Sequence, residues 1–298
     1  MRLTGIILRG ARKVLRSTGQ WLLNDAHRID SYVRSIDRAR ALSPESRLIL
    51  EKNRIFRNKH HEQRCFIIGN GTSLKTQDLS PLANELTFVM NAFWKHSIVE
   101  KWQPTYYFLC DPLFFDGSEP MKEFFRRLST RIHNSTFFVP LSAAKAVQKQ
   151  ELLPQEQTYY VAFADALSSS KITDIDLSNF VPDVINVSQF CIMVAMYMGC
   201  SPIYLLGLDH DWLSHRGKDQ HFYSSYVGLE KHPKFRPNLE DWSYKYNMEC
   251  VLTLWRGYEN LLEYANQKGT RILNATNGGF LDVFERINYK EVIDRATP

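Results

Sequence analysis

Residues 64–91 read RCFIIGNGTSLKTQDLSPLANELTFVMN, and this stretch decides the fold. Cys65 to Ile68 form a short apolar run that stops at Gly69-Asn70-Gly71-Thr72-Ser73. A buried strand followed by a glycine-rich turn is typical of the ligand-binding edge of a parallel α/β sheet. Glycines let backbone N–H groups approach an anion, and Ser73 is placed to cap the short helix that follows. The loop is therefore predicted to bind a phosphate, although an ordinary strand-to-helix turn has the same pattern.

Two common nucleotide-binding motifs are absent from this loop. A P-loop needs Gly-Lys-Ser/Thr, which the loop lacks, and a dinucleotide-binding motif needs a third glycine where Leu74 stands. The sequence therefore favours a nucleotide site of another kind.

The composition is that of a globular protein with one large domain or two small ones. Its 298 residues are 44% hydrophobic, and no window holds the ~18 unbroken apolar residues of a membrane span. Arg9, Arg12 and Lys13 interrupt the apolar run near the start, which argues against a signal peptide. The five cysteines are scattered without a CxxC spacing, so we expect reduced core residues of a cytoplasmic protein, not zinc ligands or disulfides.

Basic charge is concentrated in residues 1–60, which hold 14 Lys and Arg against 5 Asp and Glu. We therefore predict a helical arm over 1–60 and a main domain over 61–298. Because the excess charge belongs to the arm alone, we predict no nucleic-acid partner. Within residues 1–20 the cations fall in about a 100° arc of a helix, opposite apolar residues. Such a helix suits an anionic membrane surface, and packing on its own domain or on a second subunit is the alternative.

Three successive predicted strands each end in a small polar residue. Asn70 follows the first strand, Asn91 the second and Asp111 the third. In open α/β sheets, ligands bind outside the carboxyl ends of the strands. We therefore expect these three side chains to read a base and a ribose by hydrogen bonds, although Asn and Asp are also common in turns.

A second unit runs from Asn186 to Asp211. Ser188 is predicted to cap a helix that is apolar all round and ends at Gly199, so that helix is expected to be buried. The next strand ends at Gly207-Leu208-Asp209-His210-Asp211. In many sugar-nucleotide transferases, an Asp-x-Asp pair such as Asp209 and Asp211 binds Mg²⁺ or Mn²⁺. Successive strand residues point to opposite faces, so a metal site is not the favoured interpretation.

The remaining segments are predicted more coarsely. Residues 165–180 and 210–235 are expected to be loops or lids, the second rich in histidine and tyrosine. Its histidines are spaced too irregularly for zinc but can supply a general base, although a solvated surface loop is the alternative. A long amphipathic helix is predicted over 238–268, followed by a strand at 271–273 and the segment NATNGG at 274–279.

The order and spacing of these motifs resemble those of the bacterial sialyltransferases of glycosyltransferase family forty-two. They are also similar to the Maf-type flagellin glycosyltransferases and the MptE-like (DUF115-type) proteins. The likeness rests on IIGNGTSL, on the strand ends at Asn91 and Asp111, on IYLLGLDHD, and on NATNGG, which resembles NATEGG. The resemblance implies a modified Rossmann-like α/β fold of the GT-A variant, with a mostly parallel sheet and helices on both faces.

The resemblance also implies roles for individual residues. The donor phosphate and ribose would face Gly69, Asn70, Gly71, Thr72 and Ser73, and Asn91 would bind the nucleoside. Asp111 stands where the sialyltransferases have asparagine, which leaves the base open. Further donor contacts would come from the helix start and the second strand end, through Ser188, Gly207 and Asp209. Of the family's two phosphate-contacting tyrosines, one position holds Asp211, and Tyr223 replaces the other only after a longer loop. The catalytic base would be His232, just before the long helix, or His221.

The sequence and the resemblance together predict an inverting glycosyltransferase that needs no cofactor. Its donor would be a CMP-activated, sialic acid-like sugar, and its acceptor a glycan or lipid-linked glycan of bacterial surface polysaccharide or lipopolysaccharide. We expect it to work at the inner face of the cell membrane, and the sequence allows an oligomer. The alternatives are a Mg²⁺-dependent MptE-like diphosphokinase, with metal on Asp209, Asp211 and Asp111, and a non-catalytic nucleotide-sugar-binding scaffold.

Overall fold

The computed structural model describes residues 42–169, 171–214, 221–223 and 242–294. Across these residues, nine strands form one parallel sheet in the order β6-β5-β4-β3-β2-β1-β7-β8-β9. The strands are β1 (Cys65–Ile68), β2 (Leu86–Met90), β3 (Tyr106–Phe108), β4 (Thr136–Pro140), β5 (Thr158–Ala166), β6 (Phe180–Asp183), β7 (Ile203–Leu206), β8 (Ile272–Asn274) and β9 (Glu285–Arg286). The predicted Rossmann-like α/β fold is confirmed.

The direction of the chain through the sheet reverses next to β1. Strands β1 to β6 follow one another outward in sequence order, and the chain then returns to place β7 on the other side of β1. Ile68 at the end of β1 pairs with Val89 of β2 on one side and Leu206 of β7 on the other. The loops after β1 and β7 therefore leave the sheet at a topological switch point, where such sheets bind ligands.

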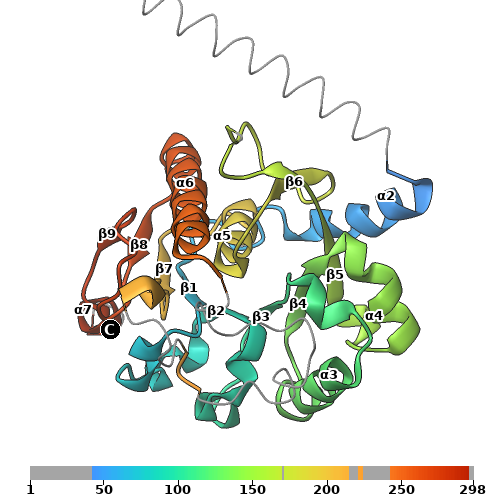
Figure 1. Cartoon of the computed structure of the whole chain (residues 1–298), viewed down its shortest axis with the longest axis horizontal. Helices are drawn as coiled ribbons and strands as arrows, with labels where there is room; N and C mark the ends of the chain where they lie inside the picture. Colours follow the sequence, from blue (N-terminus) through green and yellow to red (C-terminus); the bar gives the residue numbers. More distant parts are fainter. Residues whose placement is uncertain (1–41, 170, 215–220, 224–241, 295–298) are drawn as a thin grey trace, which may run out of the picture. The chain divides into compact units, whose positions relative to one another are not determined.

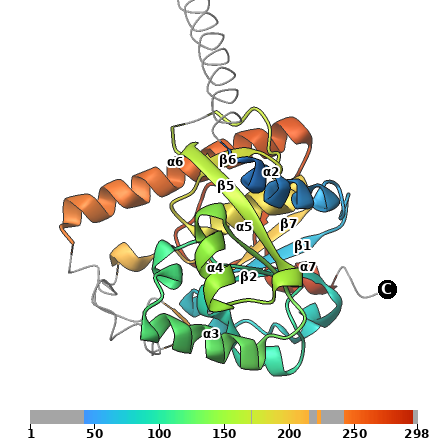
Figure 2. The ribbon, with the colours of Figure 1, turned by 90° about the vertical axis from the view of Figure 1, so that its right-hand side faces the viewer.

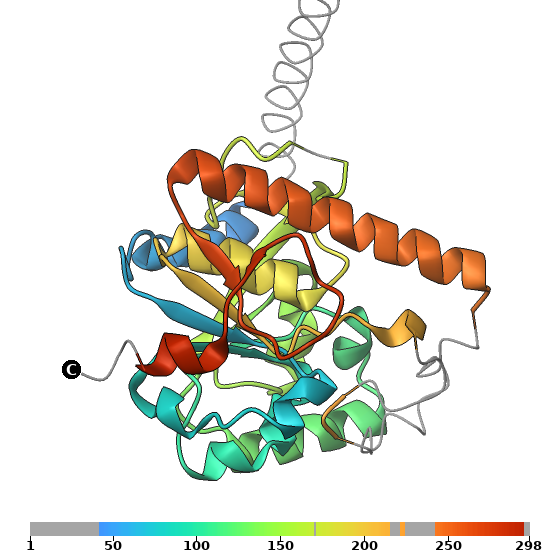
Figure 3. The ribbon, with the colours of Figure 1, turned by 90° about the vertical axis from the view of Figure 1, so that its left-hand side faces the viewer.

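Helices cover both faces of the sheet (Figures 1 and 3). The α-helices are α2 (Pro44–Glu51), α3 (Glu119–Arg131), α4 (Ala144–Gln150), α5 (Val187–Tyr197), α6 (Tyr244–Lys268) and α7 (Tyr289–Asp294). Side chains alternate along β1, so that Cys65 and Ile67 pack in the cluster of α5 and α6, and Phe66 and Ile68 in the cluster of α3. All four are buried, as expected for a parallel strand between two helical layers.

Helix α5 is buried because its sequence has no polar face, as predicted. Helix α6 lies across it, on the same face of the sheet (Figures 2 and 3). The two helices come close at Gly257, where a Cβ atom would stand 2.2 Å from the side-chain nitrogen of Gln189. Gly269, in the left-handed region with φ 72°, ends α6 as predicted. The helix begins at Tyr244, and residues 238–241 of its predicted start lie outside the described residues.

The predicted loop over 165–180 connects two strands and packs into the core. Strand β5 continues to Ala166 and β6 begins at Phe180, and the described residues between them form no helix or strand. Between them, Ile172, Ile175 and Leu177 are buried in the main core. The described residues of this segment therefore contribute to the hydrophobic core.

The start of the compact unit also differs from the expected boundary at residue 61. The contacts divide the chain into Met1–Glu45 and Ser46–Pro298. Phe56 is buried in the core, and the Asn53 amide donates to the carbonyls of Tyr160 and Leu177, 2.7 Å each. Residues 46–60 therefore belong to the main unit. The predicted membrane-binding helix lies within residues 1–41, outside the described residues.

Two sequence-level expectations concern cysteines and membrane spans. Cys65, Cys191 and Cys200 are buried, as predicted, whereas Cys110 and Cys250 are partly buried, and all five are free thiols. None of the helices in the described part of the chain has the length and hydropathy needed to cross a membrane.

Candidate functional site

A cavity of about 270 Å³ lies at the carboxyl ends of β1, β2 and β7, at the switch point. Loops from these strands and the start of α5 supply its walls. Most of the residues that line it are small or polar: Gly69, Asn70, Gly71, Met90, Asn91, Asn186, Val187, Gly207, Leu208, Asp209, His210, Asp211, Trp212 and His221. We call this cavity the switch-point pocket. It includes seven of the predicted site residues: Gly69, Asn70, Gly71, Asn91, Gly207, Asp209 and His221.

The loop after β1 is held to the loop after β7 by Asp209. One carboxylate oxygen of Asp209 accepts from the Ser73 backbone N–H at 2.9 Å, and the other accepts from the Ser73 hydroxyl at 2.8 Å. Burial raises the pKa of Asp209, and the hydrogen bonds from Ser73 oppose that shift. Gly71 is required here because a Cβ atom would stand 1.7 Å from Asp209 Oδ2. The glycine therefore serves the contact between the two loops.

This arrangement changes what the glycine loop offers to a phosphate. The N–H groups of Gly69 and Gly71 donate to the carbonyls of Leu206 and Gly207, at 2.8 and 2.9 Å. Together with the Ser73 N–H, three of the five loop amides thus bond within the protein. Ser73 does not cap the next helix, whose N-cap is Gly71 without a side-chain bond. Thr72 and Ser73 do not line the switch-point pocket.

Asn70 and Asn91 supply two amide groups to the pocket. Asn70 Nδ2 donates to the carbonyl of Met90 at 3.0 Å, which fixes the orientation of the amide. Asn91 has φ 50°, a left-handed conformation that asparagine tolerates, and its backbone carbonyl accepts a hydrogen bond from the Tyr107 hydroxyl. The Oδ1 atoms of both asparagines are buried and meet no donor among the described residues. Because a buried acceptor without a partner costs about 1–3 kcal/mol, both oxygens are suited to a ligand donor.

Asp111 does not join this group, contrary to our expectation. Its side chain is exposed and caps the 3₁₀ helix η6 (Pro112–Phe115), accepting from the Leu113 N–H at 2.8 Å. The reason is strand order, because β3 is separated from β1 by β2. Asp111 does not line the switch-point pocket.

The start of α5 also differs from the prediction. Asn186, not Ser188, is the N-cap, and its Oδ1 atom accepts from the Ser188 N–H at 2.9 Å. Asn186 lines the pocket, whereas Ser188 is fully buried beneath it. Ser188 therefore does not contact the pocket directly, but it bonds to Asn186, which does.

His210 and Tyr258 are site residues that the sequence did not single out. His210 follows Asp209 with φ 47°, lines the pocket, and contacts Trp212 and Trp255 edge-on. Its Nε2 atom lies 2.7 Å from the hydroxyl of Tyr258, which is buried on α6. Burial lowers the pKa of His210 to about 3, so the imidazole is neutral near pH 7. The sequence feature that could have identified His210 as a site residue was its place in the strand-end segment DHD. Tyr258 gave no local signal.

The described part of the histidine-rich loop places His221 at the pocket. The Phe222 N–H donates to the carbonyl of Asn70 at 2.9 Å, which anchors residues 221–223 beside the first loop. His221 stacks on Tyr223, and Tyr223 also lies against Lys95. Tyr223 itself does not line the cavity. The preferred base, His232, lies outside the described residues.

The carboxylates do not gather as a cation site would require. Both oxygens of Asp209 accept hydrogen bonds from Ser73, and Asp111 is on an outer strand. Within the described ranges, no cluster of three or more His, Cys, Asp or Glu side chains is placed to hold a metal ion. Asp209 and Asp211 both line the switch-point pocket, and the two oxygens of Asp209 already accept hydrogen bonds from Ser73.

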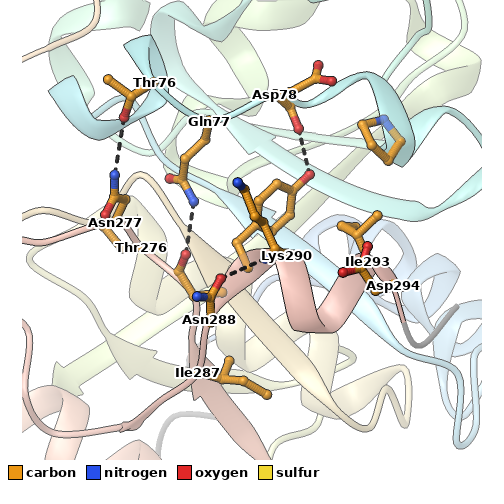
Figure 4. Close-up of a pocket in the computed structure, with 13 residues that line it drawn as sticks. Thr76, Gln77, Asp78, Thr276, Asn277, Ile287, Asn288, Lys290, Ile293 and Asp294 are labelled. Carbon is orange, nitrogen blue, oxygen red and sulfur yellow. Dashed lines mark hydrogen bonds between the residues drawn. The ribbon is translucent and has the colours of Figure 1, made fainter.

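A larger cavity of about 670 Å³ lies between the segment after β1 and the C-terminal segment (Figure 4). Several of its polar groups bond to one another across it. Gln77 donates to the Ala275 carbonyl at 3.0 Å, Asn277 to the Thr76 hydroxyl at 3.3 Å, and Tyr289 to the Asp78 carbonyl at 2.9 Å. These bonds fasten the NATNGG segment and α7 to the segment that follows β1.

Two solved structures of a sialyltransferase are similar to this chain. One similar structure is the sialyltransferase CstII from Campylobacter jejuni in complex with the substrate analogue CMP-3FNeuAc, with 18% identity over 76% of this chain and 85% of that chain, at a TM-score of 0.43. Another is CST-II in complex with a trisaccharide acceptor and CMP, with 16% identity over 76% and 86% of the two chains, at a TM-score of 0.44. No family model and no curated protein matches this chain.

Proposed function

We propose that this protein is a glycosyltransferase that binds a nucleotide-activated sugar in the switch-point pocket. The observation that carries the proposal is the pair of buried oxygens, Asn70 Oδ1 and Asn91 Oδ1, at the carboxyl ends of adjacent strands. Two acceptors call for donors on the ligand, such as ribose hydroxyls or the exocyclic amine of a cytosine. We therefore favour a CMP-activated, sialic acid-like donor.

The transfer chemistry follows from what the pocket contains. The acceptor hydroxyl must lose its proton as it attacks the anomeric carbon, and a histidine with a pKa near neutrality suits that task. His232, the preferred candidate, lies outside the described residues, and the other candidate, His221, lines the pocket. The leaving CMP carries a single phosphate, so we propose inverting transfer without a metal ion. The diphosphokinase alternative is not favoured, because Asp209 is bonded to Ser73 and Asp111 is remote.

Acceptor and location belong to the same proposal. We propose a glycan or lipid-linked acceptor of bacterial surface polysaccharide, reached at the inner face of the membrane through the basic segment of residues 1–20. Residues 1–20 hold five basic residues and no acidic ones, which supports this location.

The direct experiment measures CMP release from a CMP-activated nine-carbon sugar, with and without a glycan acceptor. We expect acceptor-dependent release that EDTA leaves unchanged. His221→Ala or His232→Ala, whichever residue is the base, should lower turnover roughly 10²–10⁴-fold with donor binding retained. Loss of activity in EDTA, with both histidine variants active, would favour the metal-dependent alternative. Donor binding without release would favour the scaffold.

A further inference from the structure

Four side chains form a hydrogen-bonded chain that starts and ends at the switch-point pocket. It runs from Asn186 Oδ1 to Ser188 Oγ (2.5 Å), to the Tyr258 hydroxyl (2.5 Å), and to His210 Nε2 (2.7 Å). Asn186 and His210 line the pocket, whereas Ser188 and Tyr258 are fully buried. Three elements contribute to it: the start of α5, the middle of α6 and the loop after β7.

Asn186 fixes the direction of every hydrogen bond in this series of four side chains. Asn186 presents oxygen, not nitrogen, because the same atom accepts from the Ser188 backbone N–H. Ser188 must therefore donate its one hydroxyl proton to Asn186. The Tyr258 hydroxyl must then donate to Ser188 Oγ, and its own oxygen remains to accept from His210.

The tautomer of His210 follows from this order. Nε2 carries the proton and donates to Tyr258, so Nδ1 of the neutral ring carries a lone pair. Described residues form no hydrogen bond with Nδ1. Because burial lowers the pKa of His210 to about 3, the ring remains neutral, and Nδ1 an acceptor, through the physiological range.

The ring is also held in one orientation. Trp212, Trp255 and Tyr258 contact the imidazole at centroid distances of 5.0, 5.9 and 5.5 Å. The backbone of His210 is in the left-handed region, which is uncommon for residues other than glycine and recurs at functional sites. A neutral acceptor of fixed direction at a pocket wall selects a ligand that can donate.

We propose that Nδ1 of His210 accepts a hydrogen bond from a hydroxyl group of the bound ligand, with Tyr258, Ser188 and Asn186 as positioning residues. This inference rests on the proposed function, since a nucleotide sugar offers such hydroxyls on its ribose and on its sugar. His210 is thus a specificity-determining contact that distinguishes a donor group from an acceptor group at one point of the ligand.

The test uses the full chain with ¹⁵N-labelled histidine and long-range ¹H–¹⁵N NMR. The signals of the His210 ring are those that disappear from the spectrum of the His210→Asn variant. Asparagine is chosen because it tolerates the left-handed backbone. At pH 7 we expect the Nε2–H tautomer in the free protein. Tyr258→Phe removes the acceptor of Nε2–H, so the signal should move toward a mixture of tautomers. Ser188→Ala should have the same effect more weakly.

Ligand binding is followed in the same spectra and by calorimetry. CMP, 2′-deoxyCMP and a CMP-activated sugar distinguish a ribose hydroxyl from a sugar hydroxyl. We expect the Nδ1 resonance to shift with the ligand that supplies the hydroxyl, and His210→Asn to weaken that ligand about three- to tenfold. An Nδ1–H tautomer in the free protein would overturn the inference. If calorimetry shows binding but the Nδ1 resonance shifts with none of the ligands, the inference about His210 is wrong and the proposed function stands. If none of the three ligands binds, both the inference and the proposed function are contradicted.

Discussion

At the scale of single residues, Asp209 joins the two loops of the site. Its carboxylate is buried, and it satisfies both the N–H and the hydroxyl of Ser73, which lies 136 positions earlier. Sequence reasoning placed Asp209 and Ser73 at the same edge of the sheet, where each was expected to contact the ligand. It could not show their bond to each other, because no local pattern encodes a pair so distant in sequence. The same holds for His210 and Tyr258.

Asp209→Ala should destabilise the protein by about 2–4 kcal/mol, because it leaves two buried donors of Ser73 without an acceptor. Asp209→Asn is the matched control. Its side-chain oxygen can accept from the Ser73 N–H while its NH₂ group donates to the Ser73 hydroxyl, so we expect a loss within about 1 kcal/mol. Urea unfolding of the three proteins measures the difference. Equal stability of wild type and Asp209→Ala would show that the two loops are held by other contacts.

At the scale of elements, the prediction succeeded where hydrophobic periodicity was strong. Strands β1, β2, β3, β7 and β8 and helices α5 and α6 were all expected close to their observed positions. Strand β6 was missed because Phe180–Asp183 is short and contains a proline, and β9 because it has only two residues. Asp111 was misplaced because the sequence gives strand ends but not strand order. The cavity collects residues from β1 and its two neighbours, and β3 is not among them.

At the scale of the whole molecule, the proposed donor site lies in the main unit, and the excess of basic charge lies in the part of the sequence that precedes this unit. The proposed location at the membrane depends on that arm. Deleting residues 1–20 should release the protein from anionic vesicles, and raised salt should release the full chain in part, because salt screens the attraction between basic side chains and headgroups. Vesicle sedimentation measures both. Equal sedimentation of the full and shortened proteins would contradict the membrane proposal and leave the transferase proposal untouched.

The central claim is that the switch-point pocket binds a cytidine nucleotide, and calorimetric titration with CMP, UMP and ATP tests it most directly. We expect CMP to bind more tightly than UMP, because the exocyclic amine of cytosine can donate to Asn70 Oδ1 or Asn91 Oδ1, whereas uracil has a carbonyl at that position. Asn91→Gly keeps the left-handed backbone and removes one acceptor, so CMP affinity should fall about three- to tenfold. Asp111→Ala, at a strand end outside the pocket, should leave it unchanged. Absence of CMP binding, or an equal loss in both variants, would contradict the account.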